Sequence, residues 1–212
     1  MKGSLRMKPQ VGIIRLATSN SGSISRGLSA LGVEVLNIDD RHKLQKCSHV
    51  IIPGVSTFGA VVEELESSEL FEPIKDLFGS KTKILGLCAG MQIMGEDSEE
   101  SPGSKGLGWF NFKSIRISGE SGSARFHTGW NSIQTRNRTQ ILSATSDSTY
   151  YFNHSYYVPA DGNKFGILGT TRYLNVDITS LFVKENVAGI QFHPEKSQKS
   201  GLAILKSFSD WR

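Results

Sequence analysis

Short apolar runs alternate with segments of helical periodicity in the first half of the chain. The runs at Val11–Leu16, Val33–Ile38, His49–Pro53 and Lys83–Leu87 are typical of buried strands. Apolar residues recur at helical spacing from Ile24 to Leu31, before Gly32, and from about Ala60 to Leu77, with an interruption expected near Pro73. Connections of this length are too long for hairpins, so the pattern predicts an α/β fold with a parallel sheet and helices on both faces.

The pattern changes after Trp109. Residues 109–183 contain short segments rich in aromatic and β-branched residues, separated by Gly, Asn, Asp and Ser, which favours antiparallel strands. The polar stretch Gly95–Lys105 lacks apolar periodicity and is expected to be an exposed loop. We expect residues 1–212 to form a single domain, with the antiparallel strands as an extension of it.

Composition and charge narrow the class of protein. The start, Met1–Lys8, lacks the apolar stretch of a secretory signal, and no apolar run is long enough for a membrane span. The net charge is +4, but the 24 basic residues are scattered, which favours a solvated surface over a nucleic-acid interface. With only two cysteines, the sequence indicates a cytoplasmic protein without a disulfide framework.

One cysteine lies in a pattern associated with nucleophilic catalysis. Cys88 follows an apolar strand in Gly86-Leu-Cys-Ala-Gly90 and precedes a helix-like segment, as in a nucleophile elbow. Its small neighbours permit a tight turn, and the start of a helix favours a thiolate. A buried packing cysteine is the alternative reading. Cys47 has no such turn, so we predict a packing or surface role for it.

A general base for this cysteine is predicted in Gln191-Phe-His-Pro-Glu195. Pro194 restricts His193 to extended backbone, and positions two apart on an extended chain face the same way, so Glu195 can orient the imidazole. For the other histidines, His42, His49, His127 and His154, we favour structural or peripheral roles.

A third element of such a site would be a backbone donor for an oxyanion. Gly54 follows a strand in Pro53-Gly-Val-Ser56 and could turn its amide toward the site. From spacing alone, a plain turn at the end of the strand is equally consistent with this segment.

Six segments together resemble class I glutamine amidotransferases. They are Pro53-Gly-Val with Phe58-Gly59, Gly86-Leu-Cys-Ala-Gly-Met-Gln92, Gly106-Leu-Gly108, His127-Thr-Gly-Trp-Asn131, Tyr151-Phe-Asn-His-Ser-Tyr-Tyr157 and Gly189-Ile-Gln-Phe-His-Pro-Glu-Lys-Ser-Gln198. The Gly-Trp-Asn, His-Ser-Tyr-Tyr and Glu-Lys-Ser-Gln runs are similar to those of one subfamily, the glutaminase subunits of imidazole glycerol phosphate synthase. The resemblance covers nearly the whole chain.

The resemblance implies a fold and a set of roles. The fold would be a flavodoxin-like, mainly parallel sheet. Cys88 would attack the amide of glutamine to form a thioester, His193 would transfer protons, and Glu195 would hold His193. Gly54 and the amide of Ala89 match the family's oxyanion region. The positions that hold the amino-acid end of glutamine match Gln92, Ser155 and Tyr156.

The resemblance also implies a partner. In this subfamily a (β/α)₈-barrel synthase forms a heterodimer with the glutaminase and receives the ammonia through a protected path. The glutaminase subunit needs no metal or organic cofactor, and no nucleic acid or membrane is involved.

Three departures from the family pattern keep alternatives open. An aspartate-tyrosine-glycine start is expected where Arg15-Leu-Ala-Thr-Ser-Asn20 stands, Ser56 replaces a glycine, and Ala89 replaces a leucine. The chain could therefore supply ammonia to a different synthase, such as one that amidates a surface-polysaccharide sugar. A non-catalytic binding module and a free-standing amidohydrolase are further alternatives.

Overall fold

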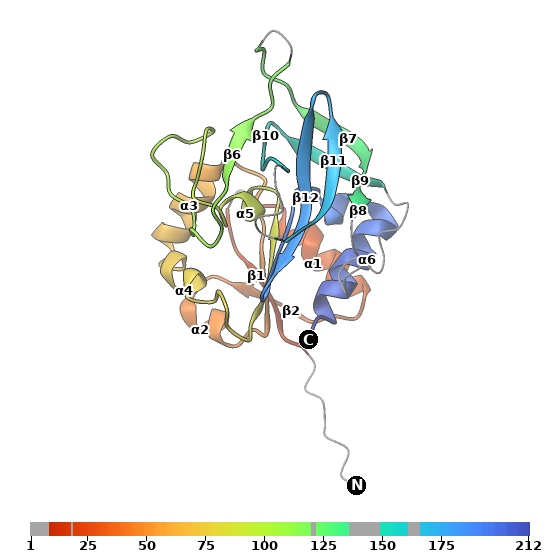
Figure 1. The fold of residues 1–212 in the computed structure, drawn as a ribbon. Helices are drawn as coiled ribbons and strands as arrows, with labels where there is room; N and C mark the ends of the chain where they lie inside the picture. The colour runs from red at the N-terminus through yellow and green to blue at the C-terminus, as the bar shows by residue number, and fades with distance from the viewer. Residues whose placement is uncertain (1–8, 18, 120–121, 136–148, 161–165) are drawn as a thin grey trace.

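The computed structural model describes residues 9–17, 19–119, 122–135, 149–160 and 166–212. An eight-stranded sheet lies at its centre, with the strand order β2-β1-β3-β4-β13-β12-β11-β8 (Figure 1). The strands, in this order, are Val35–Ile38, Val11–Ile14, His49–Ile52, Lys83–Leu87, Val187–Ile190, Val176–Lys184, Ile167–Tyr173 and Gln134–Thr135.

The first five strands of this order are parallel, and the last three are antiparallel. The parallel part has the order of a flavodoxin-like sheet, with β13 in the fifth place. Strands β1, β3 and β13 are buried along their whole length, which explains their continuous apolar sequences. The predicted α/β class, and the antiparallel addition from the second half, are confirmed.

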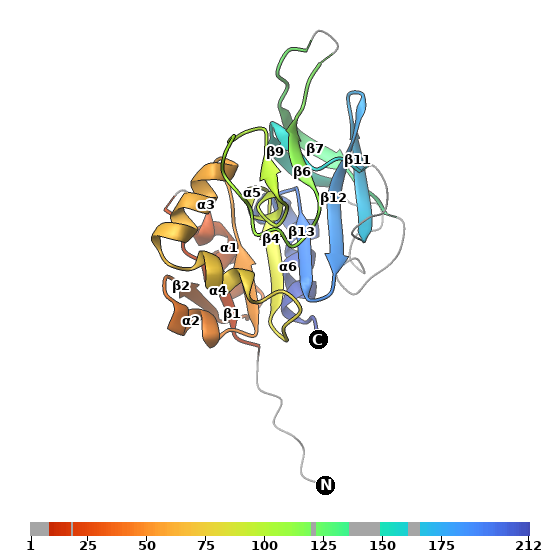
Figure 2. The same cartoon turned by 60° about the vertical axis from the view of Figure 1, so that its left-hand side comes forward.

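Two apolar clusters lie on opposite faces of the sheet. Helices α1 (Ser21–Ala30) and α6 (Gln198–Ser209) cover one face (Figure 2). Helices α2 (Arg41–Gln45), α3 (Phe58–Ser67), α4 (Phe71–Lys75) and the short α5 (Ala89–Gln92) lie on the other. Alternate residues of the strands supply the two clusters, as the pleat requires: Ile13 faces α1 and α6, whereas Ile14 faces α2 and α3.

The predicted break in the second helix is real but misplaced. Helix α3 ends at Ser67, and Glu69, with a φ of 56°, turns the chain into α4. Pro73 lies within α4, in its first turn, where a proline removes no hydrogen bond of the helix. The proline was therefore the wrong signal for the break.

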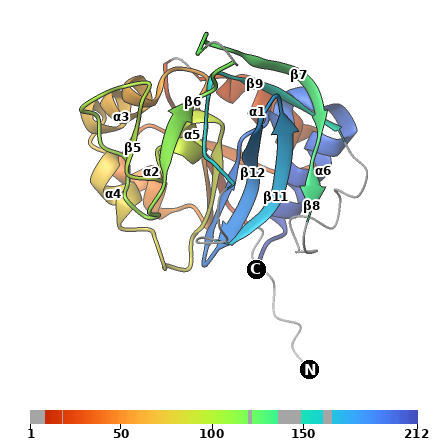
Figure 3. The same cartoon turned by 45° about the horizontal axis from the view of Figure 1, so that its top comes forward.

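Two small sheets lie over the carboxyl ends of the parallel strands (Figures 1 and 3). One contains β10 (Tyr156–Tyr157), β6 (Lys113–Arg116) and β5 (Asp97–Ser98), and the other pairs β7 (His127–Ser132) with β9 (Thr149–His154). Most of these pairs are antiparallel as predicted, but β5 and β6 are parallel. The segments that follow β3, β4 and β13 therefore lie beneath a second layer, which these two small sheets form.

Among the residues that the structure describes, no helix is both long enough and apolar enough to cross a membrane.

Candidate active site

Cys88 lies in a strained turn between β4 and α5. Its backbone has a φ of 52° and a ψ of −111°, which a non-glycine residue seldom adopts, and its N–H donates to the Ile190 carbonyl at 2.8 Å. The turn therefore has the geometry of a nucleophile elbow. Only 6% of Cys88 is exposed, at the bottom of a pocket.

Three glycines allow the backbone to pack closely around this turn. A Cβ atom on Gly90 would lie 2.0 Å from the Ile52 carbonyl oxygen. One on Gly86 would lie 2.5 Å from the Gly90 oxygen, and one on Gly54 would lie 2.5 Å from the Gly90 nitrogen. All these neighbours are backbone atoms and cannot rotate away, so only glycine fits where β3, β4 and α5 meet.

Gly90→Ala is accordingly expected to lower the free energy of unfolding by about 3 kcal/mol, because the added methyl group displaces the backbone of β3. Urea denaturation of the purified variant measures this loss. Gly22→Ala is the matched control, because Gly22 also lies in a helix and its added Cβ would meet only the Arg26 side chain at 3.5 Å. That variant should be neutral or more stable. Equal stability of both variants would contradict the close packing at the elbow.

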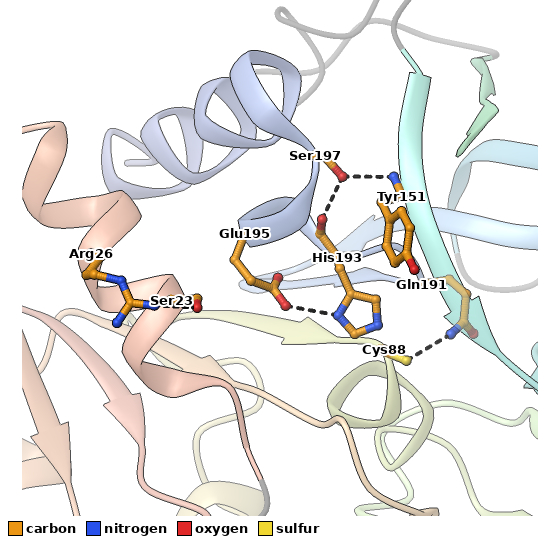
Figure 4. A network of polar contacts seen from close by, with 8 residues as sticks. All are labelled: Ser23, Arg26, Cys88, Tyr151, Gln191, His193, Glu195 and Ser197. Carbon is orange, nitrogen blue, oxygen red and sulfur yellow. Dashed lines mark hydrogen bonds and ion pairs between the residues drawn. The ribbon is translucent and has the colours of Figure 1, made fainter. Parts of the chain in front are cut away.

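His193 and Glu195 lie beside the elbow, on the segment that follows β13. The His193 Nδ1 atom is 3.0 Å from the Glu195 Oε1 atom, and the two side chains are 2% and 1% exposed (Figure 4). Because a carboxylate only accepts, Nδ1 carries the proton, and Nε2 points toward the Cys88 sulfur (Figure 4). The backbone of His193 is extended, as Pro194 requires, but Glu195 lies in the 3₁₀ turn η1 (Pro194–Lys196) and not on an extended chain.

Backbone contacts hold His193 in place from behind. Its N–H donates to the Tyr151 carbonyl at 2.8 Å. The Ser197 hydroxyl donates to the His193 carbonyl at 2.6 Å and accepts from the Tyr151 N–H at 2.9 Å (Figure 4). Strand β9 and the start of α6 therefore both fix the imidazole.

The electrostatics of this pair favour a charged imidazole. Burial alone lowers the pKa of His193, but the charge and hydrogen bond of Cys88, followed by those of Glu195, outweigh burial and raise this pKa to about 10. Negative charge on the Cys88 sulfur thus favours the imidazolium form of His193. This is the charge state that a cysteine nucleophile with a histidine acid requires.

Two glutamines lie next to the thiol. Gln191 Nε2 is 3.5 Å from the Cys88 sulfur and donates to it. Gln92 Nε2 donates to Gln191 Oε1 at 3.0 Å and to the Tyr156 carbonyl at 2.8 Å. Gln92 was singled out from the sequence, but Gln191 was not, because its contact depends on β13 lying beside β4.

The two residues expected to form an oxyanion site lie against each other. The Ala89 N–H donates to the Gly54 carbonyl oxygen at 3.4 Å. This donor is therefore engaged by the protein itself, through a long and weak hydrogen bond.

A pocket of about 320 Å³ opens above Cys88. Six of the predicted residues line it, namely Cys88, Ala89, Gln92, Ser155, Tyr156 and His193. Gly54 and Glu195 lie behind this lining. Seven further lining residues were not predicted: Val55, Ser56, Thr57, Glu100, Phe126, Asn153 and His154. The elements over the strand ends thus supply half of the pocket.

Glu100 corrects the expectation of a wholly exposed loop at Gly95–Lys105. Its carboxylate accepts from the Phe58 N–H at 2.7 Å, and the Ser101 hydroxyl accepts from the Gly59 N–H at 2.9 Å. These two side chains cap α3, where unpaired N–H groups favour an anion. Burial raises the pKa of Glu100 above its ordinary value, and the Phe58 hydrogen bond opposes that rise. Two polar residues of this segment therefore bind the start of a helix and are not simply solvated.

Within the described ranges, no group of three or more His, Cys, Asp or Glu side chains could hold a metal ion.

The parallel sheet, the elbow and the buried His193–Glu195 pair define a class of cysteine-dependent amidotransferases. The family model of class I glutamine amidotransferases matches residues 13–210, and the chain belongs to this family. Imidazole glycerol phosphate synthase subunit HisH of Pyrococcus furiosus is 35% identical to it over 205 residues, which cover 94% of this chain and 97% of that protein. The same subunit of Bacillus subtilis is 33% identical over 203 residues, which cover 94% and 95% of the two chains.

Solved structures agree on the fold. A glutamine amidotransferase crystal structure superposes with a TM-score of 0.71 at 16% identity, covering 93% of this chain and 98% of that chain. PurLQS from Thermotoga maritima superposes with a TM-score of 0.69 at 17% identity, covering 97% and 99%.

Proposed function

We propose that this chain is the glutaminase subunit of imidazole glycerol phosphate synthase and that residues 1–212 form one amidotransferase domain. The observation that carries the proposal is the strained Cys88 with the His193–Glu195 pair beside it, in a pocket of amino-acid size. The full-length similarity to subunits with that name supports the choice of pathway.

The first half of the reaction is acylation of Cys88. The thiolate attacks the side-chain amide carbon of glutamine, and a C–S bond forms as the carbonyl oxygen takes up negative charge. His193 protonates the nitrogen, the C–N bond breaks, and ammonia leaves with a glutamyl thioester on Cys88. Glu195 keeps the proton of His193 Nδ1 in place, so Nε2 is the atom that gives its proton.

The second half is hydrolysis. His193, now neutral at Nε2, takes a proton from water, and the resulting hydroxide attacks the thioester carbon. The C–S bond breaks, and the Cys88 thiolate is restored with His193 protonated again. The new carboxylic acid gives its proton to solvent and leaves as glutamate. Glutamine and water are thus converted to glutamate and ammonia.

The amino-acid end of glutamine would lie against Gln92, Ser155 and Tyr156, with the Glu100 carboxylate on another wall of the pocket. A carboxylate here suits the α-ammonium group of the substrate. The pocket therefore offers polar groups suited to the α-carboxylate and to the α-ammonium group of the substrate.

A partner that covers the pocket is the second part of the proposal. Val55 and Phe126 line the pocket and are 44% and 67% exposed, and Trp130, on β7, is 48% exposed. Large apolar side chains at a pocket rim are typical of an interface. A (β/α)₈-barrel synthase docked over this rim would receive ammonia before it reached bulk water and was protonated.

The test is glutaminase activity of the purified chain, alone and with the histidine-pathway barrel subunit of the same organism plus its nucleotide ligand. We expect strong stimulation by the liganded barrel, and its complete loss in Cys88→Ala. A well-folded barrel that gives no stimulation would overturn the choice of partner. The departure at Arg15–Asn20 would then direct the search to another ammonia-consuming synthase.

A further inference from the structure

A chain of side-chain hydrogen bonds runs from β7 to the pocket through two buried histidines that are not part of the triad of Cys88, His193 and Glu195. Asn131 Nδ2 is 3.2 Å from His127 Nε2, and His127 Nδ1 is 3.1 Å from His154 Nε2. The chain ends where His154 Nδ1 lies 2.9 Å from the Tyr156 carbonyl oxygen. His127 and His154 are 2% and 8% exposed, and His154 lines the pocket.

The partners at the two ends fix where every proton lies. A carbonyl only accepts, so His154 carries its proton on Nδ1 and accepts at Nε2. His127 must then donate from Nδ1 and accept at Nε2 from the Asn131 amide. The orientation of that amide is set by its other bonds, from Nδ2 to the Arg172 carbonyl and from the Ser132 N–H to Oδ1.

Both rings are therefore neutral, each with its proton on Nδ1. A second proton on His154 would place two N–H donors against each other in the 3.1 Å contact with His127. The surroundings agree with this state. Burial lowers the pKa of His127 to about 4, and burial followed by the charges of His127 and His193 lowers that of His154 to about 3. His127 is also stacked between the rings of Phe152 and Tyr173, at 4.4 and 4.2 Å.

The acceptor at the end of this chain belongs to the wall of the pocket. The Ile117 N–H donates to the Ser155 carbonyl, so the next position, Tyr156 opposite Arg116, has its backbone groups turned away from β6. Two side chains hold the Tyr156 carbonyl, namely His154 and Gln92. Gln92 in turn contacts Gln191, which contacts the Cys88 sulfur.

We propose that His127 and His154 are positioning residues for glutamine: the neutral pair fixes the Ser155–Tyr156 wall and thereby sets the affinity for the amino-acid end of the substrate. Cys88 lies in the turn after β4, and His193 and Glu195 lie on the segment after β13. Strand β9 contacts His193 through the backbone of Tyr151 and not through His154, so the pair leaves the reactivity of Cys88 unchanged. This inference rests on the proposed glutaminase function and extends it to residues that do not touch the reacting atoms.

His154→Phe tests the proposal, because it keeps a ring of similar size but removes both nitrogen atoms. We expect KM for glutamine to rise about tenfold, because the buried Tyr156 carbonyl loses one of its hydrogen-bond donors. The kcat should stay within about twofold of the wild-type value. Alkylation of Cys88 provides a second readout. The rate with the diazoketone analogue of glutamine, which has the amino-acid end, should fall about tenfold, and the rate with iodoacetamide, which lacks it, should change less than about twofold.

Three further variants separate positioning from loss of structure. His154→Asn keeps a donor where Nδ1 was and should restore KM to within about threefold of the wild type. His127→Phe keeps the stacked ring but frees the tautomer of His154, and KM should rise about threefold. Thr171→Val is the matched control. It removes the hydrogen bond to the Ser132 carbonyl on the same strand β7 and the acceptor of the Ser180 hydroxyl. Both bonds lie outside the hydrogen-bond chain of His127 and His154, so this variant should leave KM unchanged.

Two results would overturn the positioning role of His127 and His154. An unchanged KM in folded His154→Phe, or an equal loss with iodoacetamide and the glutamine analogue, would overturn the proposal. If His154→Phe does not fold, the same comparison of His127→Phe with Thr171→Val decides it. A wild-type chain that hydrolyses no glutamine, even with a partner, would instead remove the proposed function.

Discussion

Replacing Cys88 with serine is expected to lower kcat/KM for glutamine by roughly 10⁴-fold or more, because a hydroxyl is a far weaker nucleophile than a thiolate at neutral pH. The charge and hydrogen bond of Cys88 help to raise the pKa of His193, so the variant also lowers the pKa of this acid. Ammonia release, followed by a coupled assay with the partner present, measures the loss.

Cys47→Ser is the matched control for this substitution. Cys47 is 5% exposed, its thiol donates to the Lys43 carbonyl, and burial raises the pKa of this thiol to about 11, so it is a packing residue as predicted. This variant should keep wild-type activity with a small loss of stability. Activity of Cys88→Ser within about tenfold of the wild type would exclude Cys88 as the nucleophile.

The parts of the site that sequence could anticipate are the local ones. The elbow is predicted by an apolar strand followed by small residues around Cys88. The contact of His193 with Glu195 joins residues only two positions apart in the sequence. Even here the reason differed in part, because Glu195 reaches the imidazole from a 3₁₀ turn. This short segment therefore predicted the contact between the two side chains correctly, but it predicted the wrong backbone conformation for Glu195.

The parts that sequence missed depend on contacts between distant segments. Strand β13 pairs with β4 although about a hundred residues separate them, and that pairing brings Gln191 to the thiol. Glu100 looked like part of an exposed loop, because its role comes from the end of a helix more than forty positions earlier, at Phe58. No local periodicity contains such information.

The second layer over the strand ends illustrates the same limit. Aromatic and β-branched residues correctly indicated strands after Trp109, but the sequence did not indicate that β7 and β9 would lie over the pocket. His154 is consequently a lining residue, although a lone histidine in a β-like segment favoured a structural role. The hydrogen-bond chain through His127 reconciles both views, since the pair is structural in form and faces the substrate.

Glu195→Gln is expected to lower kcat by about 10³-fold or more while the fold is kept, since an amide of equal size replaces the carboxylate. The glutamine amide can donate to His193 Nδ1, which leaves the proton on Nε2 and removes the base that activates water. Glu195 also helps to raise the pKa of His193, so its loss lowers that pKa. The imidazolium that protonates the departing amide nitrogen is then lost at lower pH.

The alkaline limb of the profile of kcat/KM against pH should therefore move to lower pH in Glu195→Gln. Measuring the profile from about pH 6 to about pH 10, across the range between the ordinary and the raised pKa of histidine, reveals the direction of this shift. Glu72→Gln, which removes the same charge from a side chain that is 72% exposed, should leave the limb in place. A limb that moved to higher pH, or equally in both variants, would show that Glu195 does not stabilise the charged imidazole.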